Sequence, residues 1–240
     1  MINVAVIPAR GGSKRIPRKN IKLFHGKPII AYSIEVAIKS GLFDKVIVST
    51  DDDEIANIAK KYGAIVPFMR PDELSDDFTG SNDVIVHAIK ALQNQGDKIN
   101  YVGCLYPTSP LLQHQYILEA HQALIENPNK NFAFTVNKFS YPVQRAFTLE
   151  SDESIVTPIN PNALPKRSQD LPDVYHDAGQ FYLGTANSFL SGGGGVFSDK
   201  SFPVVLPSYL VQDIDNEVDW LTAELLFEAM LKRNIIGSSL

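Results

Sequence analysis

The alternation of two apolar patterns over the first 136 residues is the feature that most constrains the fold. Short runs rich in β-branched residues predict buried strands at residues 3–9, 45–50, 65–69, 101–106 and 132–136. Between these runs, apolar residues recur at helical spacing in the segments 28–40, 54–62, 81–93 and 115–126. Because strands and helices alternate, we expect an α/β protein with a mostly parallel sheet that is covered by helices on both faces.

The pattern changes after the last of these strands, where a segment rich in Pro, Asn and Asp has no helical period. This segment predicts an inserted arm rather than a further strand–helix unit, and we place it at residues 138–182. The alternation then resumes, with strands expected at 204–206 and 213–215 and a closing helix at 218–231. At roughly 100–200 residues per domain, we expect a single domain, residues 1–240, that carries the arm.

Composition and charge exclude several classes of function. Because Cys104 is the single cysteine, we expect neither a disulfide framework nor a zinc site built from several cysteines. The net charge of −5 argues against a nucleic-acid partner. No apolar run approaches the ~20 residues needed to span a membrane, and the N-terminus lacks the basic region of a signal peptide. The sequence therefore predicts a cytoplasmic protein with neither a nucleic-acid nor a membrane partner.

Positive charge gathers near the start of the chain. Residues 1–34 contain no Asp or Glu but contain seven basic residues: Arg10, Lys14, Arg15, Arg18, Lys19, Lys22 and Lys27. Most of them lie in the basic loop, residues 10–20, which follows the first expected strand at the edge where parallel sheets bind ligands. The loop matches neither the dinucleotide nor the P-loop fingerprint, but its glycines allow backbone N–H groups to approach an anion. We therefore expect a compact polyanion, with a triphosphate favoured over a single phosphate; the alternative is a solvated loop.

Asp213 and Asp215 are the second candidate for chemistry. They lie two residues apart on an expected strand, so their carboxylates are expected on the same face. Two such carboxylates repel one another unless a cation lies between them, and Mg²⁺ binds one or two carboxylates together with phosphate oxygens. We therefore predict a Mg²⁺ site at this pair. The alternative is that Asp215 caps the closing helix.

Motifs along nearly the whole chain resemble those of the sugar-acid cytidylyltransferases, a family that activates nine-carbon sugar acids as CMP esters. In chain order the matching segments are IPARGGSK at 7–14, IPRKN at 16–20, VSTD at 48–51, FMRPDEL at 68–74, PTSP at 107–110 and QDID at 212–215. The resemblance implies a Rossmann-like nucleotidyltransferase sheet. It also implies that CMP is transferred from CTP to the anomeric hydroxyl of a sugar acid, with release of pyrophosphate.

Three segments resemble the branch of this family that acts on pseudaminic acid: YPVQRA at 141–146, RSQDL at 167–171 and YHDAGQFY at 175–182. The last segment departs from the Arg-Pro-Asn-Gly-like segment of the N-acetylneuraminate type. Tyr106 is a second departure, because the N-acetylneuraminate type has a glutamine there. The resemblance therefore implies pseudaminic acid as the substrate, with legionaminic, N-acetylneuraminic or 3-deoxy-octulosonic acid as alternatives.

The resemblance also implies a role for particular residues. Arg10 and Lys19 would contact the triphosphate while Asp213 and Asp215 bind the metal, and these four are the candidate catalytic residues. The candidate substrate-binding residues are Gly12, Ser13, Lys14, Asn20, Arg70, Ser81, Tyr106, Gln144, Arg145, Arg167, His176, Gln180 and Tyr182.

For two pairs of these residues the resemblance implies a more specific role. Asn20 and Arg70 would contact the cytosine and ribose, and Arg167 or Arg145 the carboxylate of the sugar acid. The arm would deliver this arginine to a second subunit, so a homodimer is expected. Two rival classes are a nucleotide-binding regulator without catalysis, which would not need the paired aspartates, and a dinucleotide oxidoreductase, whose glycine fingerprint the chain lacks.

Overall fold

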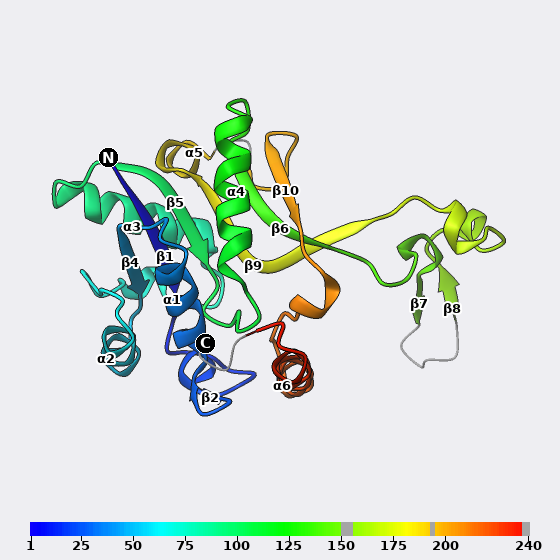
Figure 1. Cartoon of the computed structure of the whole chain (residues 1–240), viewed down its shortest axis with the longest axis horizontal. Coiled ribbons are helices and arrows are strands. Elements are labelled where there is room, and N and C mark those ends of the chain that lie inside the picture. The colour runs from blue at the N-terminus through cyan, green and yellow to red at the C-terminus, as the bar shows by residue number, and fades with distance from the viewer. Residues whose placement is uncertain (150–155, 193–194, 237–240) are drawn as a thin grey trace.

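The structure is a computed structural model that describes residues 1–149, 156–192 and 195–236. Within these ranges the central sheet has six strands in the order β10-β6-β9-β5-β1-β4 (Figure 1). Their bounds are β1 (Ile2–Pro8), β4 (Lys45–Ser49), β5 (Ile99–Leu105), β6 (Phe132–Lys138), β9 (Tyr175–Thr185) and β10 (Ser201–Val205). β1 is parallel to β4 and β5, and β10 is parallel to β6, whereas β9 runs antiparallel to β5 and β6. The expected mostly parallel sheet is confirmed.

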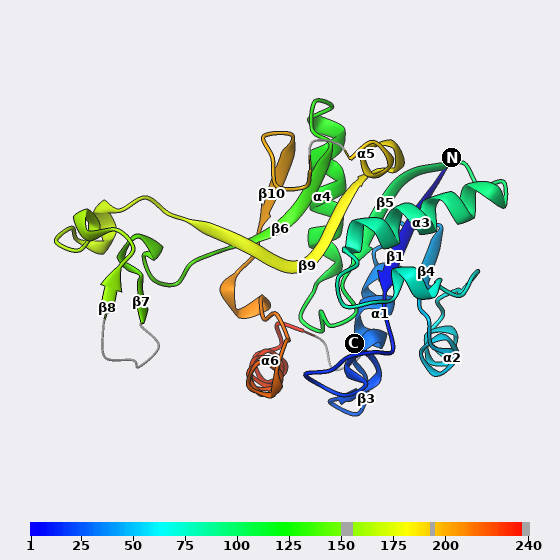
Figure 2. The same cartoon turned by 180° about the vertical axis from the view of Figure 1, so that it is seen from behind.

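Helices cover both faces of this sheet, as the sequence predicts (Figure 2). Successive buried side chains of β1 lie on opposite faces of the sheet, as in any strand. Val4 and Val6 pack in one hydrophobic cluster with α3 (Ser81–Asn94) and α5 (Ala186–Leu190). Ala5 and Ile7 pack in the cluster of the other face, with α1 (Ile29–Lys39), α2 (Asp53–Lys61) and α4 (His114–Glu126).

A third cluster joins the two ends of the chain. It packs α6 (Glu217–Lys232) against Phe24 of the short hairpin β2 (Leu23–Phe24) and β3 (Lys27–Pro28). Ile16 of the basic loop and Ile214, which lies between Asp213 and Asp215, are both fully buried in this cluster. Burial of these two side chains holds the basic loop beside the aspartates.

Two expected strands are not found in the described part of the chain, and these predictions are wrong. Residues 65–69 make one isolated bridge, between Ile65 and Ile47, and Pro67 then lacks the N–H donor that would extend it. Residues 213–215 lie in the loop that enters α6. Asn216 and Asp219 form a capping box there, which starts the helix. The alternative that Asp215 caps this helix is therefore wrong.

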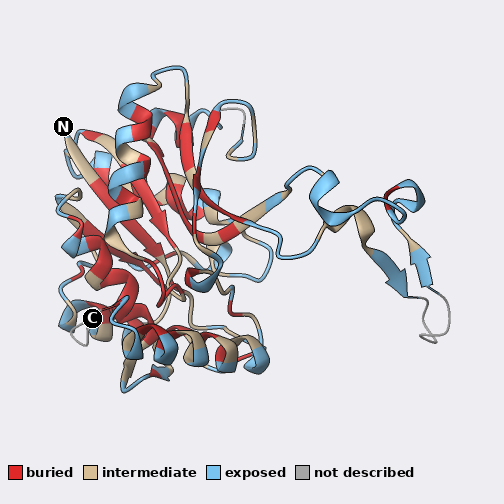
Figure 3. Ribbon diagram, turned by 45° about the vertical axis from the view of Figure 1, so that its right-hand side comes forward, coloured by how far each residue is buried: buried red, intermediate tan, exposed pale blue. Residues whose placement is uncertain are grey.

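The segment between β6 and β9 projects from the sheet as an arm (Figure 3). Its described part contains the hairpin β7 (Phe147–Leu149) and β8 (Val156–Pro158), and residues 150–155 lie outside the described residues. At its base Lys138 still pairs with Tyr175, so the ends of the predicted arm, 138–182, belong to strands of the sheet. Large apolar side chains of the arm, Tyr141, Phe147 and Ile159 among them, are exposed.

Short 3-10 helices complete the described elements: η1 (Lys19–Ile21), η2 (Asp72–Leu74), η3 (Val143–Arg145), η4 (Pro161–Ala163), η5 (Ser168–Asp170) and η6 (Ser208–Leu210). None of the helices in the described ranges is both long enough and apolar enough to cross a membrane.

Candidate active site

A cleft of about 580 Å³ opens beyond the carboxyl ends of β1 and β5. It brings together ten of the residues that the sequence singles out: Arg10, Ser13, Lys14, Lys19, Asn20, Arg70, Ser81, Tyr106, Asp213 and Asp215. The basic loop and the segment before α6, which are some two hundred residues apart in the chain, therefore share one cavity. This is the place where parallel α/β sheets bind their ligands.

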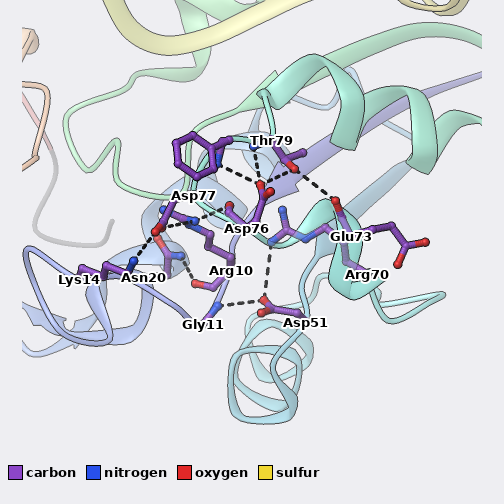
Figure 4. Close-up of polar contacts among 11 residues, drawn as sticks. Arg10, Gly11, Lys14, Asn20, Asp51, Arg70, Glu73, Asp76, Asp77 and Thr79 are labelled. Atoms are coloured by element: carbon purple, nitrogen blue, oxygen red, sulfur yellow. Dashed lines mark hydrogen bonds and ion pairs between the residues drawn. The ribbon is translucent and has the colours of Figure 1, made fainter.

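Cations dominate one end of the cleft, where an acidic loop contacts them (Figure 4). The Arg10 guanidinium donates to the carbonyl of Asp76 at 2.5 Å and lies 2.7 Å from the carboxylate of Asp77, which Lys14 also contacts. Hydrogen bonds from Lys14 and Arg10 hold the pKa of Asp77 below its ordinary value. Arg10, which is expected at the triphosphate, and Lys14 are thus held by Asp77, a residue that was not predicted from the sequence.

Hydrogen bonds fix the backbone of the basic loop. The Gly11 N–H donates to Asp51 Oδ1 at 2.9 Å, and Asn20 Nδ2 donates to the carbonyl of Arg10 at 2.9 Å. A side chain at position 11 would meet Asp52, since an added Cβ would lie 2.7 Å from Asp52 Oδ2. The loop is therefore held against α2 by contacts that leave little room at Gly11.

Arg18 has a different environment from the other cations of the loop. Its guanidinium binds Asp52 at 2.5 and 2.9 Å and Glu54 at 2.5 Å, at the start of α2. The hydrogen bond from Arg18 lowers the pKa of Asp52 to about 2, although partial burial opposes the shift. Asp52 is also the N-cap of α2, so Arg18 anchors the loop to this helix and does not line the cleft.

The segment that holds the two aspartates is in direct contact with two cations of the basic loop. Lys19 Nζ donates to the carbonyl of Ile214 at 2.5 Å and lies 3.6 Å from Asp215, and Arg15 lies 2.9 Å from Asp215. Asp213 is exposed by solvent-accessible area. The protein around its carboxyl group nevertheless desolvates the charged form and so raises the pKa, and the negative charge of Asp215 raises it further. A cation bound here would relieve that repulsion.

The residues present fit a Mg²⁺ ion that would take some of its ligands from the protein and the others from water and a nucleotide. Within the described residues no group of three or more His, Cys, Asp or Glu could hold a metal by itself. Mg²⁺ commonly takes only one or two carboxylates and completes its octahedron with water and phosphate oxygens. The pair Asp213 and Asp215 supplies that number of carboxylates in a cleft that is also lined by Arg10, Lys14 and Lys19.

Arg70 is the most deeply buried cation that lines the cleft. Its side chain is 4% exposed, and its nearest carboxylate, that of Asp51, is 3.8 Å away. Its Nε and Nη2 atoms have no hydrogen-bond partner among the described residues, and burial lowers its pKa. Because unsatisfied buried donors are costly, this guanidinium is suited to bind an acceptor on a ligand.

Hydroxyl groups replace charges at the other end of the cleft. Tyr106 follows β5, and its hydroxyl lies 3.5 Å from Ser81 Oγ, at the start of α3, and 3.5 Å from the hydroxyl of Tyr182 on β9. Tyr182 does not line the large cleft, but together with Ser81 and Tyr106 it lines a small, mainly apolar pocket of about 170 Å³. This end offers hydrogen bonds and apolar surface, which suit an uncharged part of a substrate.

Several predicted site residues do not line the cleft. Arg145 donates to Lys166 and Ser168, Arg167 pairs with Asp170 at 2.7 Å, and Gln144 donates to the carbonyl of Pro172, all within the arm of the same chain. At β9, the buried Gln180 donates to the carbonyl of Leu210, and His176 packs against Phe139. Gly12 is not among the residues that line the cleft, and a Cβ added there would have no atom within 4 Å. The binding roles of these residues stay predictions.

Other residues that line the cleft were not predicted as site residues from the sequence, among them Asp77, Thr79 and Thr108. Asp77 lies in a loop between expected elements and carries no pattern of its own. Thr108 belongs to the PTSP motif, whose position after β5 was the available signal.

The fold and the cleft define a nucleotidyltransferase, and comparisons with known proteins agree. The family described as cytidylyltransferase matches residues 4–191. The chain therefore belongs to the cytidylyltransferase family. It is 46% identical over 228 residues to a pseudaminic acid cytidylyltransferase of Campylobacter jejuni. This match covers 95% of this chain and 97% of the relative. It is 31% identical over 226 residues to the CMP-N,N'-diacetyllegionaminic acid synthase of Legionella pneumophila, covering 94% and 96%.

A solved structure shares the fold at low sequence identity. The CMP:2-keto-3-deoxy-manno-octonic acid synthetase complexed with CTP has a TM-score of 0.69 and 17% identity, and the match covers 96% of this chain and all of that one. The Rossmann-like nucleotidyltransferase sheet implied by the sequence motifs is thus confirmed.

Proposed function

We propose that the protein transfers CMP from CTP to the anomeric hydroxyl of pseudaminic acid, which gives CMP-pseudaminic acid and pyrophosphate. The observation that carries this proposal is the single cleft that joins the cations of the basic loop, the paired aspartates and the tyrosine end. The 46% identity to a pseudaminic acid cytidylyltransferase over 95% of the chain supports the choice of sugar acid.

The cleft can perform this reaction by positioning and by neutralising charge. The anomeric oxygen forms a bond to the α-phosphorus, the bond from that phosphorus to the bridging oxygen breaks, and pyrophosphate leaves. The hydroxyl proton passes to solvent. Arg10 and Lys19 bind the triphosphate oxygens and stabilise the charge that develops on them, once the triphosphate has displaced Asp77 from Arg10.

Asp213 and Asp215 are the residues that would hold Mg²⁺. When bound, the ion would supply Lewis-acid polarisation of the phosphate oxygens. Lys19 donates to the backbone between these two aspartates, so the same side chain positions the carboxylates and faces the anion. Two buried donors of Arg70 lack hydrogen-bond partners among the described residues, so Arg70 would bind acceptors of the nucleoside; Asn20 lines the same cleft.

We also propose that the protein acts as a homodimer in the cytoplasm. The arm exposes large apolar side chains, including Tyr141, Phe147 and Ile159, on a hairpin that extends away from the core. An isolated two-stranded hairpin is marginally stable in water, so contact with a second subunit would stabilise it. Such contact would bring Arg145 or Arg167 to the partner's sugar site.

An assay of pyrophosphate release with CTP, Mg²⁺ and pseudaminic acid tests the proposal. Release above the blank is expected, and its absence would refute the activity. Competition among pseudaminic, legionaminic, N-acetylneuraminic and 3-deoxy-octulosonic acids tests the sugar, since the charged end of the cleft should serve all four. CTP binding without turnover on any of them would favour the nucleotide-binding regulator.

A further inference from the structure

A shift of register in β9 brings Asp177 next to Tyr182. In the pairing with β6, Phe134 is the partner of Tyr182 and Val136 is the partner of Asp177. An advance of two residues along β6 therefore corresponds to five residues along β9. In a regular strand, residues five positions apart would be roughly 16 Å apart and on opposite faces. Gly179 lies within the shifted segment. Its φ is +62°, a backbone conformation that favours glycine.

The result is a direct contact between the two side chains. The Tyr182 hydroxyl donates to Asp177 Oδ2, and the backbone N–H of Gly179 donates to Asp177 Oδ1 at 3.2 Å. No ion pair to Asp177 is found among the residues that the structure describes, so these donors carry its hydrogen bonding. Irregular strand pairing of this kind is common next to active sites, where it redirects side chains.

The carboxylate sets the direction of the hydrogen bonds that lead to the cleft. A carboxylate only accepts, so Tyr182 must donate to Asp177, and the Tyr182 oxygen is left to accept. The Tyr106 hydroxyl, 3.5 Å from that oxygen, then donates to Tyr182. Burial raises the pKa of both tyrosines, so both hydroxyls keep their protons at neutral pH.

Tyr106 therefore presents an oxygen acceptor at the cleft. Ser81 Oγ, 3.5 Å away, already donates toward this oxygen. We propose that Asp177 is a positioning residue that, acting through Tyr182, holds Tyr106 as the acceptor for an N–H or O–H donor of the sugar acid and so contributes to the choice of sugar. This inference rests on the proposed function. Asp177 itself does not line the cleft, and a sugar acid that offers an acceptor at this place would be bound less well.

The substitution Asp177→Asn tests the direction of the chain at nearly constant shape. The Gly179 N–H requires an oxygen at one position of the side chain, so the amide NH₂ would face Tyr182 and donate to it. Tyr182 would then donate to Tyr106, and the acceptor at the cleft would be lost. We expect the KM for pseudaminic acid to rise about tenfold or more, with kcat and the KM for CTP unchanged.

A double-mutant cycle separates this role from a structural one. In a Tyr182→Phe background the connection is already broken, so Asp177→Asn should have no further effect on the KM for the sugar acid. Tyr182→Phe alone should raise that KM in the same direction, which tests the inference even if Asp177→Asn does not fold. Asp97→Asn, at an ion pair with Lys45, is the matched control.

Three outcomes are decisive. A parent enzyme that is active on pseudaminic acid, with KM effects confined to the sugar and absent in the Tyr182→Phe background, supports the inference. Additive effects, or equal effects on CTP and sugar, overturn it and leave the proposed function intact. A parent protein that turns over none of the four acids overturns the proposed function and this inference with it.

Discussion

The two ends of the cleft are built in different ways. At the charged end, Arg10, Lys14 and Lys19 come from one loop, and their charges are visible in the sequence as a basic run after a strand. At the tyrosine end, Ser81, Tyr106 and Tyr182 come from three separate parts of the chain, and a register shift in β9 brings Asp177 into contact with Tyr182. Under the proposed function, the first arrangement would bind the charged triphosphate and the second would distinguish one sugar acid from another. Changes at the two ends should therefore have separable effects.

The largest effect is expected at the carboxylates. Asp213→Asn should lower kcat by about a thousandfold or more, because a metal held by one carboxylate stabilises the triphosphate charge less well. Pyrophosphate release at saturating CTP measures this, and chelation of divalent ions should abolish the activity of the parent until Mg²⁺ is added. Asp97→Asn controls for loss of a carboxylate outside the cleft. Full activity of Asp213→Asn would contradict the role given to the pair.

The next effect is expected in the basic loop. Lys19→Ala should lower kcat/KM for CTP by about a hundredfold, since it removes a preorganised cation and the hydrogen bond to Ile214. Lys22→Ala is a matched control from the same part of the chain, because Lys22 pairs with Glu217 and lies over Trp220. Equal losses in both variants would show that general charge, rather than the position of Lys19, controls CTP binding.

A smaller effect is expected at the tyrosine end. Tyr106→Phe removes only the hydroxyl and should lower kcat/KM for pseudaminic acid by about tenfold, while the KM for CTP stays constant. Steady-state kinetics with each substrate varied in turn distinguishes the two. Tyr116→Phe, on α4 outside the cleft, is the control. A raised KM for CTP would break the separation between the two ends.

Asp77 should act in the opposite direction. Its carboxylate binds Arg10 and Lys14, so an incoming triphosphate must displace it. Asp77→Asn should therefore lower the KM for CTP by about two- to fivefold, the range expected for exposed ion pairs. The change should shrink at high salt, where such pairs are screened. A higher KM would show instead that Asp77 holds the cations in their productive places.

The last change concerns Asp52, which lies beneath the basic loop, and its expected effect is on stability. Asp52→Ala removes the N-cap of α2 and should lower the free energy of unfolding by about 1 kcal/mol. The folded-state pKa of Asp52 is lowered from 3.8 to about 2, so its ionised form stabilises the fold above pH 3.8. That contribution is lost as the pH falls through about 2. Urea unfolding of both proteins should show the difference at pH 7 and a smaller one near pH 2.

Much of the fold follows from local pattern. Most strands and helices of the first 136 residues were predictable because β1 is a continuous buried apolar run, whereas the buried residues of α3 recur at helical spacing. Residues 65–69 have strand-like composition, but Pro67 limits their pairing to one bridge. Asp213 and Asp215 reach the cleft from a loop, since the capping box of α6 overrides the apparent strand.

The candidate site was predictable to a different degree at its two ends. The cations and aspartates carry their chemistry in their residue types, so the sequence indicates them without coordinates. The contact between Asp177 and Tyr182 depends on a shift of three residues between β6 and β9, and Asp77 reaches Arg10 from a loop of no regular pattern. Both depend on tertiary pairing, which a single sequence does not display.

The most direct measurement is a crystal structure with CTP and Mn²⁺, in which anomalous scattering locates the metal. We expect the ion between Asp213, Asp215 and phosphate oxygens, with Arg10 and Lys19 on the same triphosphate. An ion on the phosphates that touches neither aspartate, or a CTP molecule bound away from the basic loop, would contradict the shared site.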